Sequence, residues 1–63
     1  MVKVHLPDGQ VATTHAGTIE EILLCLNLNP YEILITRDNE LLLADDFVNE
    51  NDEIHATSIV HGG

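Results

Sequence analysis

The 63-residue sequence has few cationic side chains: two, Lys3 and Arg37, against eleven acidic ones, for a formal net charge of −9. Nucleic-acid binding requires Lys and Arg to neutralise phosphates, so the composition argues against a nucleic-acid partner. It disfavours an anionic membrane surface for the same reason. A protein partner with a basic surface would be attracted. Alternatively, the acidity serves solubility or reflects the habitat.

Cysteine is also scarce. Cys25 is the only one, so the chain forms no internal disulfide and has no Cys-x-x-Cys pair to suggest zinc. No basic residue lies near Cys25 in the sequence to activate its thiol. We therefore expect Cys25 to be a small buried hydrophobe on the flank of a helix.

Long apolar runs are missing as well. No stretch reaches the ~20 apolar residues of a membrane span. No signal peptide is visible, because Lys3 falls in an alternating segment. These features predict a soluble, cytoplasmic protein. The length allows one small domain, with a core too small to be hollowed by a deep catalytic cleft, so we expect a monomeric protein that enzymes act upon and not an enzyme.

The first half of the chain predicts a hairpin and a helix. Alternating apolar residues over 2–6 indicate a strand, Pro7-Asp8-Gly9 a turn, and residues 10–14 a returning strand. Thr18-x-x-Glu21 is a capping box. It opens a helix with one apolar face, and Pro30 ends that helix by residues 27–29. The apolar face consists of Ile19, Ile22, Leu23 and Leu26.

The second half predicts three strands, at 33–36, 41–43 and 54–60. Asp38-Asn39 supplies the first turn, and a loop over 44–53 is pinned by Phe47 and Val48. This order predicts an α+β fold in which one helix crosses a mixed sheet of four to five strands. The first and last strands lie side by side in its middle. Residues 1–60 form the domain and 61–63 a flexible arm.

The sequence ends in Gly62-Gly63. Glycine has no Cβ, so this end of the chain could enter a narrow channel in which another enzyme reaches the terminal carboxylate. The alternative is that the glycines are merely a mobile end, as at many termini.

The chain resembles the ubiquitin-like β-grasp sulfur carriers and modifiers: the thiamine sulfur carrier, the small subunit of molybdopterin synthase and the small archaeal modifier proteins. The resemblance spans nearly the whole chain. The chain differs from the family at Arg37, where the family usually has an apolar residue, and at Asp38-Asn39, where Asn-Gly is more common. The resemblance rests on the Thr18-x-x-Glu21 helix start, the Leu-Asn-Leu-Asn-Pro-Tyr-Glu stretch over 26–32, Asp38-Asn39-Glu40-Leu41, Asp52-Glu53-Ile54 and Val60-His61-Gly62-Gly63.

The resemblance implies that an adenylating enzyme of the ubiquitin-activating type uses ATP to activate the carboxylate of Gly63. Sulfur then replaces AMP to give a thiocarboxylate, or a thiol or lysine amine attacks the activated carbonyl. Gly62 would keep the arm slender. The chain has no Gly-x-x-x-x-Gly-Lys-Ser/Thr motif for ATP, so the chemistry would belong to the partner.

Both strands of the 33–43 region are apolar on both faces, which predicts an exposed patch for partner binding. We expect Ile35 and Leu43 in this patch, with Val60 and His61 beside it. Either Leu34 or Ile35, and one of the three leucines over 41–43, should be exposed. Alternatively, the loop carrying Phe47 covers the patch, and His61 is simply solvated.

His5 and His55 are expected on the two central strands, facing away from the helix. A metal pair is conceivable, but no third ligand is evident, so we expect exposed histidines and no metal.

Three functions are consistent with the sequence. The first is a sulfur carrier serving a sulfur donor or acceptor enzyme, and the second is a modifier joined through Gly63 to lysines of target proteins. The third is a β-grasp interaction module with an inert end. The sulfur acceptor stays open among thiamine, molybdopterin, a tRNA base and cysteine synthesis.

Overall fold

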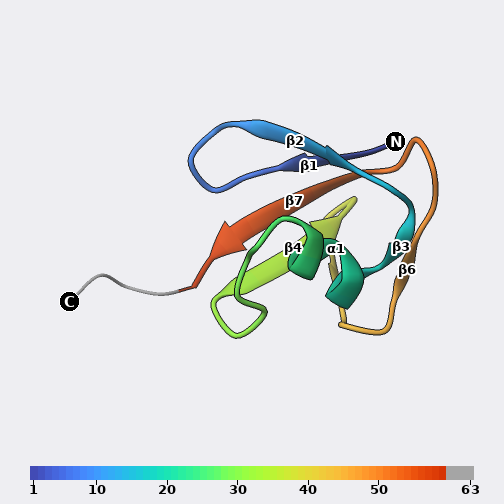
Figure 1. Ribbon diagram of the computed structural model, residues 1–63. Helices are drawn as coiled ribbons and strands as arrows, with labels where there is room; N and C mark the ends of the chain where they lie inside the picture. The colour runs from blue at the N-terminus through green and yellow to red at the C-terminus, as the bar shows by residue number, and fades with distance from the viewer. Residues whose placement is uncertain (60–63) are drawn as a thin grey trace.

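A computed structural model describes residues 1–59 of the chain. One short helix packs against one face of a five-stranded mixed sheet with strand order β2-β1-β7-β4-β5 (Figure 1). The central strands β1 and β7 are parallel, and the other neighbouring pairs are antiparallel. In chain order the elements are β1 (Val2–His5), β2 (Val11–Thr14), β3 (Gly17–Thr18), α1 (Ile19–Cys25), β4 (Ile33–Arg37), β5 (Glu40–Leu42), β6 (Phe47–Val48) and β7 (Glu53–Ser58).

This arrangement confirms the predicted α+β fold, which is of the β-grasp type, with the first and last strands in the middle of the sheet. Several predicted strand boundaries shift by one residue: β1 ends at His5, β2 begins at Val11, β4 ends at Arg37, β5 covers Glu40–Leu42 and β7 begins at Glu53. β7 ends at Ser58, before the predicted boundary at Val60. The predicted limit of the domain at residue 60 lies outside the described residues.

The core is almost entirely aliphatic and lies between α1 and the sheet. Side chains at alternate strand positions face the helix, as the pleat of a strand requires. Val2, Val4, Ile54 and Val48 are fully buried, and Ile22 of α1 is 2% exposed. The buried face therefore follows from the alternation in the sequence.

The first hairpin turns at Pro7-Asp8-Gly9. Gly9 has φ 91°, a backbone conformation that other residues rarely adopt. Its N–H donates to the Leu6 carbonyl at 3.0 Å, and Gln10 N–H donates to Asp8 Oδ1 at 3.0 Å. These bonds close a three-residue loop with glycine at the left-handed position.

The second hairpin uses an unusual dipeptide. Asp38 and Asn39 have φ 53° and 67°, and the residues on either side of them, Arg37 and Glu40, are paired in the sheet. Two central residues with positive φ match the twist of the flanking strands. Asp and Asn are the residue types that adopt this region at the least cost after glycine, so the departure from Asn-Gly preserves the turn.

Helix α1 begins at the predicted capping box. Thr18 Oγ1 accepts from Glu21 N–H at 3.2 Å, and Glu21 Oε1 accepts from Thr18 N–H at 2.9 Å. The helix ends at Cys25, earlier than predicted and for a different reason. Asn27 takes φ 60°, and Leu28 N–H donates to the Leu23 carbonyl at 2.8 Å. This left-handed cap ends the helix several residues before Pro30.

The loop over 44–53 contains a strand that the sequence did not predict. β6 pairs with β3 in a separate two-stranded sheet, with Gly17 opposite Val48 and Thr18 opposite Phe47. Val48 is fully buried, whereas Phe47 is exposed. The loop is therefore pinned by Val48 and by backbone pairing, and not by both apolar residues.

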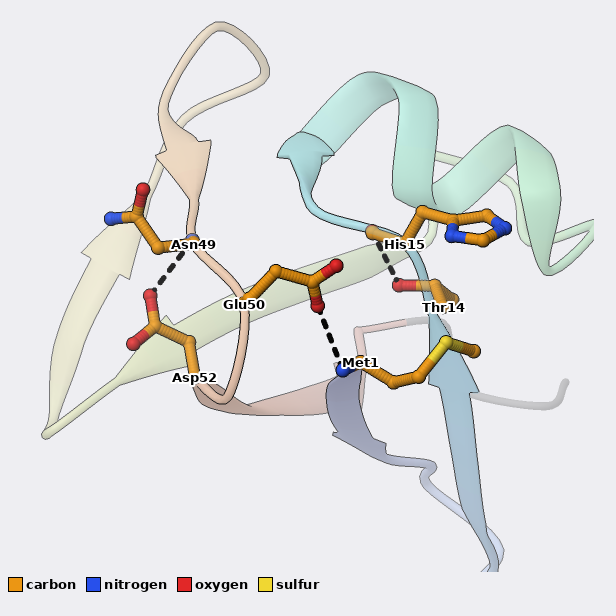
Figure 2. A network of polar contacts seen from close by, with 6 residues as sticks. All are labelled: Met1, Thr14, His15, Asn49, Glu50 and Asp52. Carbon is orange, nitrogen blue, oxygen red and sulfur yellow. Dashed lines mark hydrogen bonds and ion pairs between the residues drawn. The ribbon is translucent and has the colours of Figure 1, made fainter.

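Polar contacts hold the segment between β6 and β7, which leads the chain to the centre of the sheet (Figure 2). Asp52 Oδ2 accepts from Asn49 N–H at 2.9 Å, and the N-terminal ammonium of Met1 lies 2.7 Å from Glu50 Oε2. These contacts set the start of β7 beside β1. Within residues 1–59, no helix is long and apolar enough to cross a membrane.

Candidate functional site

The face of the sheet that α1 does not cover carries polar side chains at its centre. His5 of β1 is paired with His55 of β7, and His55 with Thr36 of β4. Both histidines alternate with buried residues that face the helix, so they point to the opposite side, as predicted. The parallel pairing of β1 and β7 brings together two residues fifty positions apart.

His5 and His55 are stacked. Their ring centroids are 4.5 Å apart and the ring planes differ by 12°. His5 Nε2 also lies 2.7 Å from Glu53 Oε2, within hydrogen-bond distance. Glu53 precedes His55 by two residues and therefore shares its face of the strand. The sequence predicted the two histidines on one face but missed the carboxylate beside them.

The contact with His5 has an electrostatic consequence. The hydrogen bond from the His5 ring, followed by the charge of that ring, lowers the pKa of the Glu53 carboxyl below its ordinary value of 4.5. A charged carboxylate is the better acceptor, which is why the contact favours the ionised form. Glu53 therefore stays anionic to a lower pH than a carboxyl without this contact.

Within the described part of the chain, no group of three or more His, Cys, Asp or Glu side chains is arranged to hold a metal ion. His5 and His55 use their ring faces against each other. The stacked pair is best described as a polar centre on an otherwise partly apolar sheet face.

The apolar strand residues divide by face in a way that corrects one predicted site residue. Ile35 is only 2% exposed and belongs to the core, so it cannot present a side chain to a partner. Leu34 is 40% exposed and takes that place. Leu43 is 62% exposed, as predicted, and Leu41 joins it at 54%. Phe47 is itself exposed and does not bury these leucines.

The strand β7 leads toward the predicted reactive end. β7 lies between β1 and β4, and Ile59 N–H donates to the Glu32 carbonyl at 2.9 Å. β1 pairs with residues 53–55 and β4 with residues 55–58, so the end of β7 and Ile59 are held from the β4 side. The predicted site residues Val60, His61, Gly62 and Gly63 lie outside the described residues.

The prediction for Cys25 is wrong: the side chain is exposed. Cys25 is the last residue of α1, so no later turn of the helix lies beside its side chain to cover it. The residue lines a shallow hollow of about 200 Å³ together with His15 and Glu21. Only the position of the helix end, set by Asn27, could have indicated this exposure.

Arg37 has a structural role that the sequence did not indicate. Its guanidinium donates to Asp52 Oδ2 at 3.1 Å, and both side chains are about one-third exposed (33% and 31%). Asp52 thereby links the β4–β5 hairpin to the turn before β7. The pair lines a polar hollow of about 400 Å³ that also contains Asp38 and Asn51. The partners are fifteen residues apart, so no local spacing pointed to the contact.

Comparisons with models of known protein families and with curated protein sequences found no match to this chain.

Proposed function

We propose that this protein is a sulfur carrier whose Gly63 carboxylate is adenylated by a partner enzyme and converted to a thiocarboxylate. One observation carries the proposal: the strand that leads to Gly62-Gly63 is a central strand of a β-grasp sheet. A substrate presented from that position is attached to a rigid body, because β7 is paired on both sides. A partner can then hold the body while it acts on the end.

The proposed chemistry uses the chain as substrate. A Gly63 carboxylate oxygen attacks the α-phosphorus of ATP, and pyrophosphate leaves. A persulfide on a donor enzyme then attacks the acyl carbonyl through its outer sulfur, and AMP leaves. A thiol of the donor enzyme attacks the inner sulfur of the acyl disulfide, which releases the Gly63 thiocarboxylate and leaves a disulfide on the donor enzyme. The anhydride is needed because a free carboxylate is a poor electrophile whose charge repels nucleophiles. ATP belongs to the adenylating partner, and the use of cellular ATP and sulfur places the proposed reaction in the cytoplasm.

The partner would hold the domain through exposed apolar side chains and through the residues that precede the glycines in the sequence. Leu34 and Leu43 supply apolar contact area. Val60 and His61 join β7 to the glycines in the sequence and are proposed to line the entrance of the partner's channel. The net charge of −9 would steer the monomeric chain toward a basic enzyme surface.

Mass spectrometry of the intact chain tests the proposal. The protein is expressed in a host able to mobilise sulfur, together with the adenylating enzyme of its native organism. We expect the mass increase of one oxygen-to-sulfur exchange, located on Gly63 by fragmentation. Deleting Gly62 and Gly63 should abolish the exchange without altering the fold. An unchanged mass with an active partner would contradict the proposal.

The same activated carbonyl could react with a lysine amine, which makes a protein modifier the second candidate. Lys3 is the only lysine, so Gly63 of one copy could be joined to another copy only at the Lys3 amine or at the N-terminal amine. Isopeptide-linked adducts of Gly63 on other proteins in native extracts would favour this candidate. If the chain without Gly62 and Gly63 kept its full biological activity, a simple interaction module would be favoured instead.

A further inference from the structure

An apolar groove lies along the edge of the sheet at β5. It measures about 190 Å³, and every residue that lines it is apolar. Its lining combines four side chains of the core, Ile19, Leu23, Ile35 and Leu42, with Pro30, Ile33 and Leu34 and with Leu41, Leu43 and Ala44 of the rim segment 41–44. We call this feature the edge groove.

The edge groove is open because β5 has only one neighbour. β5 is the last strand of the sheet and pairs with β4 alone. Leu41 and Leu43 on the rim are more than half exposed, and Leu34 beside them is 40% exposed. Three large aliphatic side chains in one place on a domain this small are a candidate contact surface.

Carboxylates lie next to the rim of the edge groove in the chain. Glu40 and Asp45 bracket the segment 41–44 in the chain, and Glu20 N–H donates to the Ala44 carbonyl at 3.0 Å. None of these three carboxylates takes part in an ion pair within residues 1–59, where the ion pairs use Glu50, Glu53 and Asp52 instead.

Neither cationic side chain lines the groove. Arg37 is the strand partner of Glu40, but its guanidinium contacts Asp52, and Lys3 lies on β1, two strands from β4. An apolar groove with carboxylates beside its rim and no cation in its lining is complementary to an apolar segment with basic neighbours.

We propose that the edge groove binds an apolar segment of another protein that is flanked by lysine or arginine side chains. The proposal depends on the groove alone and not on chemistry at Gly63. A second copy of this chain is a poor occupant, because each copy carries a net charge of −9 and would bring the same carboxylates beside its rim.

A synthetic peptide with a run of leucines between two pairs of lysines serves as the probe. Its binding is followed by the amide chemical shifts of the full-length protein at low salt. We expect shifts over residues 33–35 and 41–44, and binding that weakens as salt is added. A peptide with glutamate in place of lysine should bind at least tenfold more weakly.

Matched variants locate the site. Leu43→Ala removes an exposed leucine from the rim and should weaken binding about tenfold. Leu24→Ala removes a leucine that is 67% exposed but does not line the groove, and should leave binding unchanged. Glu40→Gln and Asp45→Asn should each weaken binding about threefold. Asp8→Asn, in the distant first hairpin, should have no effect.

Several results would overturn the proposal. Equal binding of the lysine and glutamate peptides would remove the charge argument. Shifts centred on His5 and His55 would place the contact at the centre of the open sheet face, away from the β5 edge. Shifts of residues 41–44 on dilution of the protein alone would identify a second copy as the occupant. Loss of sulfur transfer with the groove intact would count against the proposed function but not against this site.

Discussion

The two faces of the sheet are built from the same strands but differ in nearly every physical property. On the face toward α1, Val4 and Ile54 are fully buried among other aliphatic side chains. On the opposite face, the next residues along the same strands, His5 and His55, stack on each other with Glu53 at hydrogen-bond distance. A step of one residue thus separates core from surface.

The comparison teaches where this small domain places stability and where it places recognition. Burial of aliphatic surface stabilises the fold roughly in proportion to area. The open face and its β5 edge add little stability, because their contacts are exposed to solvent. They offer charge, hydrogen bonds and three exposed leucines instead. Substitutions on the buried face should therefore act mainly on stability, and substitutions on the open face mainly on binding.

The largest loss of stability is expected from a cavity on the buried face. Ile54→Ala should lower the free energy of unfolding by about 2–5 kcal/mol, which includes the cost of the cavity. Ile54→Val should cost about 0.5–1.5 kcal/mol and keep the protein folded for measurement. His55→Ala, one residue away on the open face, should cost less than either. Urea unfolding provides the values, and a larger loss for His55→Ala than for Ile54→Ala would contradict the assignment of faces.

A smaller effect is expected at the start of the helix that covers the buried face. Thr18→Ala removes the hydroxyl that accepts from Glu21 N–H, and should cost about 1 kcal/mol. Thr18→Ser retains the acceptor and serves as the control. Thermal unfolding followed by circular dichroism distinguishes the two, and equal midpoints for alanine and serine would show that the cap contributes nothing.

The free energy of unfolding should depend on pH through two carboxylates, Glu21 at the start of the helix and Glu53 on the open face. Hydrogen bonds from Thr18, first from its backbone, lower the pKa of Glu21 below 4.5, and the contact with His5 lowers that of Glu53. Both carboxylates therefore stabilise the fold above pH 4.5, and this contribution is lost as the pH falls from 4.5 through the lower folded-state values.

Glu21→Gln and Glu53→Gln should each flatten the fall in unfolding free energy over this acidic range. Unfolding at several pH values measures the slope. The part removed by Glu53→Gln should be more sensitive to salt, because it involves two charged side chains, whereas Glu21 accepts from neutral donors. A slope unchanged in both variants would show that neither carboxylate is linked to folding.

The smallest effect on stability is expected at the edge of the open face. Leu41→Ala should change the free energy of unfolding by less than about 0.5 kcal/mol, as at most exposed positions. Leu42→Ala, which alters the adjacent and buried leucine, should cost about 2–5 kcal/mol. Parallel urea titrations give both numbers, and similar losses would mean that the strand does not separate the leucines by face.

Much of the fold was predictable because its signals are local. The alternation over 2–6, the capping box of Thr18 and Glu21, and the turn at Asp38-Asn39 each act within a few residues. Single residues with positive φ were harder to anticipate. Asn27 ends the helix early, and this early end exposes Cys25. Asparagine adopts either backbone region, so its type alone does not fix the helix end.

The candidate site was only partly predictable. The sequence analysis predicted Ile35 as the partner-binding residue, but Leu34 is the exposed one. Both faces of that strand are apolar, so only the strand register decides which residue faces the helix. The contacts of Glu53 with His5 and of Asp52 with Arg37 join residues far apart in the chain. No periodicity in the sequence reports such contacts.

By itself, the sequence determined the class of fold, the aliphatic core, the excess of negative charge and the glycine pair on which the proposed function depends. Tertiary structure alone decided which leucines reach solvent, that two histidines stack, and that residues of α1, β4 and β5 line one apolar groove. The reason is physical: backbone preferences and alternation act over a few residues, whereas the neighbours of a side chain depend on which strands pair and in which register.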